Sequence, residues 1–397
     1  MTPDLVKMPP RRWPKITVWR AIFAAILLSG GYATYLRVFY GLGGSTNLTD
    51  KFPWGLWIGF DVMCGVGLAA GGFTLVAIVH IFNIQQYRPV LRPAILTAFL
   101  GYLLVSLGLA YDVGRPDRLW HPLVMWNPHS VMFEVAWCVT LYSTVLFLEF
   151  IPMVFERFGL HKPMEWIHRI SVPLMILGVL LSTLHQSSLG TLFLIVPEKL
   201  YPLWYTPILP LLFYVSAIAV GLAMTIFESW HSSRAFGRAL ELPLLASIGR
   251  VLAVAMSVYL WIRFLDLLHR EVFPLLLRNR IETWLFALEI ALALIPTVLL
   301  YQARIRRSAG ALYVCAVMVV FSFIANRLNV GITGIEAGSG THYLPKWSEV
   351  AVTLSLVAVG FAVFRVIGQY FPVFEAHPAQ SGVARAEEKE ADPLAVG

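Results

Sequence analysis

Asp61, Glu134 and His185 are ionisable residues that lie inside, or at the end of, long apolar stretches of the sequence. An ionisable group in such surroundings is costly, so each is a candidate for function. Carboxyl and imidazole groups hold and release protons, and in their protonated forms they donate hydrogen bonds. These residue types predict proton transfer to a ligand that accepts hydrogen bonds.

Glu228 and Tyr102 are weaker candidates, because each has a structural alternative. Glu228 ends an apolar stretch, where it could take up protons or simply mark the membrane interface. The hydroxyl group of Tyr102 could relay protons, although a buried tyrosine usually belongs to the core. Arg263 and Asp266 are three residues apart, a spacing that favours an ion pair on one helix. Further polar residues in or beside apolar stretches are Gln186, Glu289, Asn326, Arg327 and Glu349.

The elements that position these residues are predicted to be membrane-spanning helices. The chain of 397 residues is 58% hydrophobic and 13% charged, with a mean hydropathy of +0.71. A soluble domain has about 25% charged residues. A membrane-spanning helix needs about 20 mostly apolar residues. The stretches that qualify are Ile16–Tyr40, Trp54–Phe82, Leu91–Tyr111, Ser130–Val154, Ile170–Leu184, Leu203–Phe227, Val251–Leu268, Trp284–Tyr301, Ala311–Val330 and Val350–Ile367.

We therefore predict an all-α fold, a polytopic membrane bundle of about ten transmembrane helices. Residues 1–15 form a cytoplasmic segment, residues 16–370 the transmembrane domain, and residues 371–397 a cytoplasmic disordered tail. The loops on one side hold about twice as many Lys and Arg residues as those on the other, which places both termini in the cytoplasm. In a bacterium this is the inner membrane, and the opposite face meets the periplasm.

The depth of the polar residues predicts where they gather. At a rise of about 1.5 Å per residue, Asp61 and Glu134 fall in the outer half of the membrane, and His185 falls at the outer end of the fifth stretch. The sequence therefore predicts one polar pocket near the outer face. A set of separate structural ion pairs is the alternative.

The sequence argues against metal centres and nucleic-acid binding. Cys64, Cys138 and Cys315 form no CxxC pair, which excludes a thiolate-ligated iron–sulfur cluster and a c-type haem. A b-type haem needs a pair of histidines within the spans, but His185 alone is well placed and His80 lies at a boundary. The net charge of +7 fits inner loops that face anionic lipid rather than a nucleic-acid surface.

Five motifs carry a resemblance to a known family: FPWGLWIGFDVMCGVGLAAGGF (52–73), DVGRPDRLW (112–120), NPHSVMFEVAWCVTLY (127–142), TLHQSSLGTLF (183–193) and HYLPKWSE (342–349). Together they resemble the HybB family, the membrane subunit of hydrogenase-2-type nickel–iron hydrogenases, within the NrfD/PsrC superfamily. The resemblance covers most of residues 30–370. FPWGLWIGFD and TLHQSS are specific for the HybB-like branch, whereas DVGRPDR occurs across the superfamily.

The resemblance implies a subunit that transfers electrons between the quinone pool and a periplasmic, ferredoxin-like iron–sulfur subunit linked to a catalytic subunit. Menaquinone or ubiquinone would be the bound substrate, with no haem, iron–sulfur cluster or metal in this chain. Whether protons cross the membrane stays open. By this resemblance the quinone site holds Asp61, Asp112, His129, Glu134 and His185, and the proton path holds Tyr102, Glu134 and Glu228. Glu134, His185 and Asp61 would be the reacting groups.

Other functions remain open at this point. The same quinone site could serve a different complex, with a multihaem cytochrome or an oxidoreductase for sulfur compounds or molybdenum substrates. A secondary transporter is an alternative of another class. Broken helices that meet at the midplane would favour it, whereas the polar residues of this sequence cluster towards the outer face. A passive anchor would leave the intramembrane charges without a reason.

Overall fold

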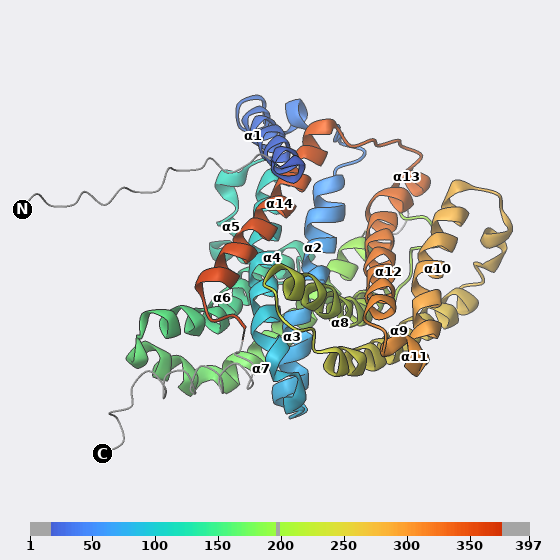
Figure 1. The fold of residues 1–397 in the computed structure, drawn as a ribbon. Coiled ribbons are helices and arrows are strands. Elements are labelled where there is room, and N and C mark those ends of the chain that lie inside the picture. The colour runs from blue at the N-terminus through green and yellow to red at the C-terminus, as the bar shows by residue number, and fades with distance from the viewer. Residues whose placement is uncertain (1–16, 196–198, 375–397) are drawn as a thin grey trace, which may run out of the picture.

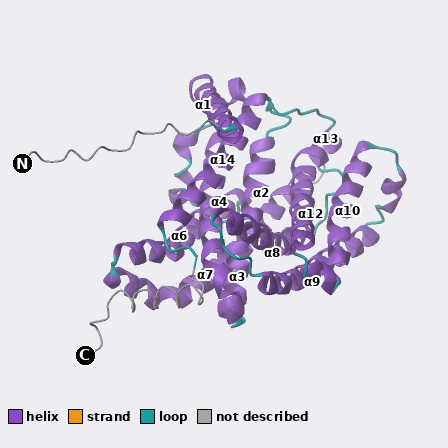
Figure 2. Ribbon diagram, in the orientation of Figure 1, coloured by secondary structure: helices purple, strands orange, loops and turns teal. Residues whose placement is uncertain are grey.

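The structure is a computed structural model that describes residues 17–195 and 199–374. Over this part of the chain it is helical and holds no strand (Figure 2). The predicted tail and N-terminal segment fall largely outside the described residues. Ten helices in the described part are long and apolar enough to cross a membrane, as the sequence predicts. The chain is therefore a polytopic helical membrane protein.

Several spans contain more than one helix. The ten spans are, in order, α1 (Val18–Ser45); η1 (Trp57–Val62) with α2 (Met63–Leu68), α3 (Gly71–Val76) and η2 (Ala77–Ile81); η3 (Gln85–Val90) with α4 (Leu91–Asp112); α6 (Val131–Phe158); α7 (His161–Leu192) with η5 (Phe193–Ile195); α8 (Leu209–Ala235); α9 (Leu242–His269); α10 (Ile281–Tyr301); α12 (Ala309–Leu328) with η8 (Asn329–Thr333) and α13 (Gly334–Ser339); and α14 (Trp347–Tyr370). Short helices η4 (Pro116–Arg118), α5 (His121–Val124), η7 (Phe273–Leu277) and α11 (Ala303–Arg306) lie in the connections. We call the end at which the second, fourth, sixth, eighth and tenth spans begin the outer end.

The second and sixth spans form the centre of the bundle. The most apolar stretch of the second span is 78% buried and that of α8 is 67% buried, against 17% for α1 and 22% for α14. The first and last spans pack against each other on the periphery, where α1 and α14 lie side by side (Figure 1). The central spans are thus the ones whose polar residues are most shielded from lipid.

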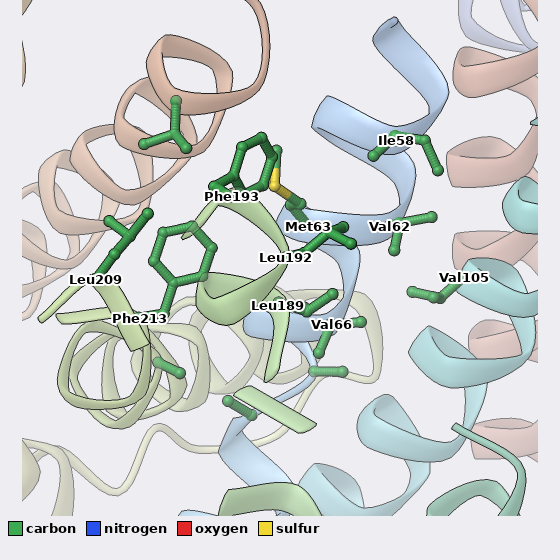
Figure 3. Packing of buried hydrophobic residues seen from close by; sticks show 14 of the residues in the cluster. Ile58, Val62, Met63, Val66, Val105, Leu189, Leu192, Phe193, Leu209 and Phe213 are labelled. Atoms are coloured by element: carbon green, nitrogen blue, oxygen red, sulfur yellow. The ribbon is translucent and has the colours of Figure 1, made fainter. Parts of the chain in front are cut away.

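Close helix contacts in the centre depend on glycine. Gly221 of α8 meets Ala70 and Gly71 of the second span, where an added Cβ would lie 2.8 Å from the carbonyl carbon of Ala70 and the nitrogen of Gly71. Both neighbours are backbone atoms, which cannot move aside as a side chain can. Apolar side chains fill the adjoining space, including Val62 and Val66 of the second span and Leu189 of α7 (Figure 3).

The fifth span is longer than predicted. The sequence predicts Ile170–Leu184, but the span continues from His161 to Ile195, so His185 lies well inside it rather than at its end. The polar residues that suggested an end remain helical because their hydroxyl groups donate to carbonyl groups one turn earlier. Ser187 donates to Thr183, and Ser188 donates to Leu184. Two other spans also differ from the prediction. The sixth begins later, at Leu209 rather than Leu203, and the ninth extends further, to Ser339.

The glycine contact between α8 and the second span predicts a strong effect of one substitution. Gly221→Leu should lower the melting temperature of the purified chain by several degrees or prevent its accumulation, because the backbones must separate. Gly310→Leu is the matched control, since an added Cβ at Gly310 meets nothing within 4 Å. Equal melting temperatures for the two variants would contradict the close contact.

Candidate functional site

The polar residues of the spans form three clusters rather than the single pocket predicted from depth. Depth along a helix does not reveal which face a residue occupies, and the faces separate them. The Asp61 cluster consists of Asp61, Arg37, Asp112, Glu349 and Thr353. The His185 cluster consists of His185, Tyr102, Tyr142, Glu134 and Ser188. The Glu289 cluster consists of Glu289, Trp204, Asn326, Arg327 and Asn329.

Asp61 joins three spans at the outer end. It lies in η1, a π-helical turn, and its side chain is 8% exposed. The hydroxyl group of Thr353 on α14 donates to Asp61 Oδ2 at 2.8 Å. On α4, Gly108 leaves room for the carboxyl group, because an added Cβ there would lie 2.8 Å from the Cβ of Asp61. A carboxyl group is thus held between α4 and α14 by one hydrogen bond.

A second acid and its cation lie beside Asp61. Asp112 ends α4, and its Oδ1 is buried without a hydrogen-bond partner. It interacts electrostatically with Arg37 and Glu349. Arg37 of α1 is itself fixed by donating to the carbonyl groups of Tyr111 and Val113, both at 2.7 Å. An arginine fixed by carbonyl groups can balance the charge of nearby acids without closing an ion pair on either of them.

Glu349 completes this cluster through the loop before α14. The hydroxyl group of Tyr343 donates to Glu349 Oε1 at 2.8 Å, and the backbone N–H of Leu56 donates to the Tyr343 oxygen, also at 2.8 Å. Burial raises the pKa of Tyr343 above its usual range, so the phenol stays protonated and remains a donor. The loop therefore positions Glu349 through a neutral donor.

The His185 cluster lies between α4, α6 and α7. His185 is fully buried, its Nδ1 lies 2.9 Å from the Tyr102 hydroxyl oxygen, and its Nε2 has no hydrogen-bond partner. The ring of Tyr142 packs edge-on against that of Tyr102, with 4.6 Å between the centroids. The Nδ1 atom of His185 is therefore fixed by the phenol of Tyr102, while its Nε2 atom remains available for a hydrogen bond.

Glu134 reaches the same interface from the first turn of α6. Its Oε1 accepts a 2.5 Å hydrogen bond from Ser188, one turn along α7 from His185. His129, which the resemblance placed at the same site, lies five residues earlier in the chain and is exposed. The structure therefore brings Glu134 and His185 onto one interface and leaves His129 at the surface.

Glu149 is a half-buried acid that the sequence analysis missed. It lies on α6, its Oε1 is buried without a hydrogen-bond partner, and Gly178 of α7 provides the space beside it. An added Cβ at Gly178 would be 3.7 Å from that oxygen and 3.9 Å from the ring of Tyr142. Its signal in the sequence was a lone acid inside an apolar stretch, the same signal that singled out Glu134.

In the Glu289 cluster the buried carboxylate is hydrogen-bonded by neighbouring protein side chains. The carboxylate of Glu289 accepts hydrogen bonds from Trp204 at 3.0 Å, Asn326 at 2.8 Å and Asn329 at 2.9 Å. Arg327 lies over the ring of Phe213, with 3.5 Å from its guanidinium carbon to the ring centroid, and donates to Asn326 at 2.6 Å. This arrangement is that of a structural network, since each polar group of Glu289 already has a protein partner.

The predicted pair of Arg263 and Asp266 does not form. Asp266 accepts two hydrogen bonds from Arg270, one turn later, at 2.7 Å and 3.0 Å. Arg263 instead donates to the carbonyl group of Leu203 at 2.8 Å. Both spacings place two side chains on one helix face, and the loop before α8 offers a carbonyl acceptor to each arginine, Leu203 to Arg263 and Pro202 to Arg270.

A cavity of about 580 Å³ lies between the second, third, sixth and tenth spans. Most of its lining is apolar, from residues such as Leu68, Leu104, Met224 and Leu356. Asp61 lies at its outer end. The polar residues at its opposite end are Thr97, Glu228, His231, Ser232 and Arg365. Cavities of about 300–1,000 Å³ with few polar groups are typical of small-molecule sites.

Glu228 belongs to this cavity and not to the His185 cluster. Thr97 donates to Glu228 Oε2 at 2.7 Å, and the other carboxyl oxygen is buried without a partner. Thr97, Leu100 and Leu104 present one face of α4 to the cavity, whereas Tyr102 contacts His185. Tyr102 and Glu228, which the resemblance placed on one proton path, are therefore separated by α4.

The histidines do not fit a b-type haem between two spans. Of the histidines in the described residues, His185 alone is buried, and the others are exposed or half-buried. The described part of the chain also holds no group of three His, Cys, Asp or Glu residues that could bind a metal ion. A pair of axial ligands for a buried haem is thus missing from this part of the structure.

This arrangement predicts a simple spectrum. The purified chain should show no reduced-minus-oxidised absorbance of a b-type haem, because one buried histidine cannot supply two axial ligands. Quantifying pyridine haemochrome against protein is the measurement. One haem per chain would contradict the geometry.

Comparisons with known proteins agree with this architecture. The family described as "Polysulphide reductase, NrfD" matches residues 44–337. A protein of Nitratidesulfovibrio vulgaris whose name states no activity is 36% identical over 374 residues, which cover 91% of this chain and 96% of that protein. The probable Ni/Fe-hydrogenase 2 b-type cytochrome subunit of Escherichia coli is 33% identical over 85% of this chain and 87% of its own length.

A more distant relative is the integral membrane subunit of menaquinone reductase from Nitratidesulfovibrio vulgaris. It is 27% identical, over 91% of this chain and 92% of its own length. The family match takes in the second to ninth spans, with Asp61, the His185 cluster and the Glu289 cluster. It leaves out most of α1 and all of α14, which supply Arg37 and Thr353 to Asp61 and its neighbours. The chain belongs to the NrfD family of membrane proteins.

Proposed function

We propose that this chain is the quinone-reactive membrane subunit of a respiratory oxidoreductase complex of the hydrogenase-2 type. The names of its relatives support this, because they describe membrane subunits of a nickel–iron hydrogenase and of a menaquinone reductase. The observation that carries the proposal is the apolar cavity that ends at Asp61. It offers an apolar ligand from the lipid a path to a buried carboxyl group.

The quinone ring lies at the outer end of this cavity. Its two carbonyl groups are acceptors, so reduction needs donors that also deliver protons. Asp61 is one donor when protonated, and Asp112 lies beside it with an unpartnered oxygen. Arg37 fits the negative charge that develops on the ring oxygen as electrons arrive, because its positive charge is fixed close to Asp112.

Electrons reach the ring from a partner. The described residues hold no set of metal ligands, so we assign electron delivery to an iron–sulfur subunit that docks on the outer end. The connection from Asp112 to Glu134 leads from one cluster to the other along the chain. It exposes Trp120 and Trp126, together with Arg115.

Protons reach the ring through the chain's own side chains. Quinone reduction to quinol consumes two electrons and two protons, and the two carbonyl oxygens become hydroxyl groups. The His185 cluster is the second proton reservoir, since Glu134, Ser188, His185 and Tyr102 lie together across α4 from Asp61. Orientation with both termini in the cytoplasm belongs to this proposal and follows from the distribution of Lys and Arg.

The b-type haem in the name of the Escherichia coli relative has no place in this scheme. The residues that the structure describes do not fit it, because among them His185 has no buried histidine opposite. No step of the proposed reaction passes through a haem.

Glu134→Gln should abolish quinone-linked turnover of the purified complex while its activity with a soluble dye remains within twofold of wild type. The amide still accepts a hydrogen bond from Ser188 but no longer carries a proton, so the fold is kept and proton delivery is lost. Turnover is measured with a quinone analogue and with the dye in parallel.

Asp117→Asn is the matched control, because Asp117 is an exposed acid on the same face that pairs with Arg115. It should leave both activities unchanged. Loss of dye activity in Glu134→Gln would point to failed assembly, and full quinone turnover would remove Glu134 from the mechanism.

A further inference from the structure

The cavity beside Asp61 is more exposed at one end than at the other. At the Asp61 end Val105 and Leu356 are buried, Phe60 is half-buried and Val357 is exposed. At the other end His231, Ala235 and Arg365 are exposed. The lining runs along α14 from Leu356 to Arg365, nine residues that rise about 14 Å. The cavity is therefore a tunnel whose more exposed end, the mouth, lies opposite Asp61.

The tunnel wall suits an apolar chain better than water. Between Asp61 and Glu228 its lining is made of aliphatic and aromatic side chains. A buried water needs two to four polar partners, and apolar cavities stay dry. A volume of about 580 Å³ is too large to be a packing defect in an interior packed as densely as a crystal. An apolar chain therefore fits the size and the chemistry of this wall.

One wall of the tunnel is α14, which lies beyond the part of the sequence that matches the family. Residues 44–337 match the NrfD family, and α14 begins at Trp347. Without α14, the faces of α4 and α8 that line the tunnel would lie open to the lipid. The tunnel of this chain therefore depends on its tenth span.

We propose that the tunnel holds the isoprenoid chain of a long-chain quinone, which enters at the Arg365 end and brings its ring to Asp61. This rests on the proposed function and adds to it the access route and the class of substrate. The ring passes first through the mouth, and the chain then fills the tunnel behind it. A quinone without a chain leaves the tunnel empty and gains no binding energy from its wall.

Gly360→Leu tests the tunnel directly. Gly360 lines the tunnel on α14, and an added Cβ would lie 2.6 Å from Leu104 Cδ1, the end of a flexible side chain that can move. The larger side chain obstructs the passage and leaves Asp61 untouched. Gly31→Leu is the matched control, because Gly31 lies on exposed α1 with nothing within 4 Å of an added Cβ.

Binding is measured with the full chain in lipid nanodiscs, using a long-chain menaquinone and menadione, which has the same ring without the chain. In Gly360→Leu the affinity for the long-chain quinone should fall at least tenfold while that for menadione stays within twofold. Gly31→Leu should change neither. An equal loss for both quinones, or no loss for either, overturns the tunnel.

The result also separates the tunnel from the proposed function. If wild type binds neither quinone, the proposed function fails. If wild type binds both quinones and Gly360→Leu changes neither affinity, the quinone site is supported and the tunnel is contradicted.

A second measurement tests the mouth. Ala235→Cys places a thiol at the exposed rim of the tunnel, and the native Cys64, Cys138 and Cys315 are buried and do not compete for a maleimide. Long-chain menaquinone should slow maleimide labelling of Ala235→Cys at least threefold, and menadione should not. Ala239→Cys, exposed nearby but outside the tunnel, should be labelled at the same rate with either quinone. Equal protection of both thiols, or of neither, contradicts access at this end.

Discussion

The hydrogen bond from Thr353 to Asp61 joins the last span, α14, to the centre of the bundle. A carboxyl group inside a membrane must find its partners within the protein, because lipid offers none. Asp61 finds one partner on α14, while Gly108 lets the backbone of α4 pass close beside it. This contact, together with the hydrogen bond from Trp57 Nε1 to the carbonyl group of Glu349 at 3.2 Å, sets α14 as the wall of the cavity. The quinone site that we propose exists only where α14 is held in this position.

The three polar clusters differ in how completely their hydrogen bonds are made. The Glu289 cluster binds the sixth, eighth and ninth spans into a unit whose hydrogen bonds are all made within the protein. The His185 cluster leaves one imidazole nitrogen unused, and the Asp61 cluster leaves one oxygen of Asp112 unused. Buried groups without partners are expensive, so these atoms, like the unpartnered oxygens of Glu149 and Glu228, are ones that a ligand or a transferred proton would satisfy. The Glu289 carboxylate differs from them because both of its oxygens accept hydrogen bonds from the protein.

The sequence predicted the ten spans, since their apolar length is a property of composition alone. It also identified most of the buried polar residues, from Asp61 to Arg327, because a lone charge in an apolar stretch is visible without a structure. It could not show that α4 separates Tyr102 from Glu228, since depth along a helix does not define a face. It predicted too short a fifth span because Ser187 and Ser188 resemble a helix end, although their hydroxyl groups bond back into the helix. Arg37 and Thr353 were missed because their importance comes from spans far apart in the chain.

The central claim is that a quinone ring meets Asp61 at the outer end of the cavity. A cryo-electron microscopy map of the complex with bound long-chain menaquinone tests it most directly. The account predicts ring density within hydrogen-bonding distance of the Asp61 carboxyl group, continuous with chain density that passes Gly360. Ring density beside His185 on the opposite side of α4, with the cavity empty, would contradict it.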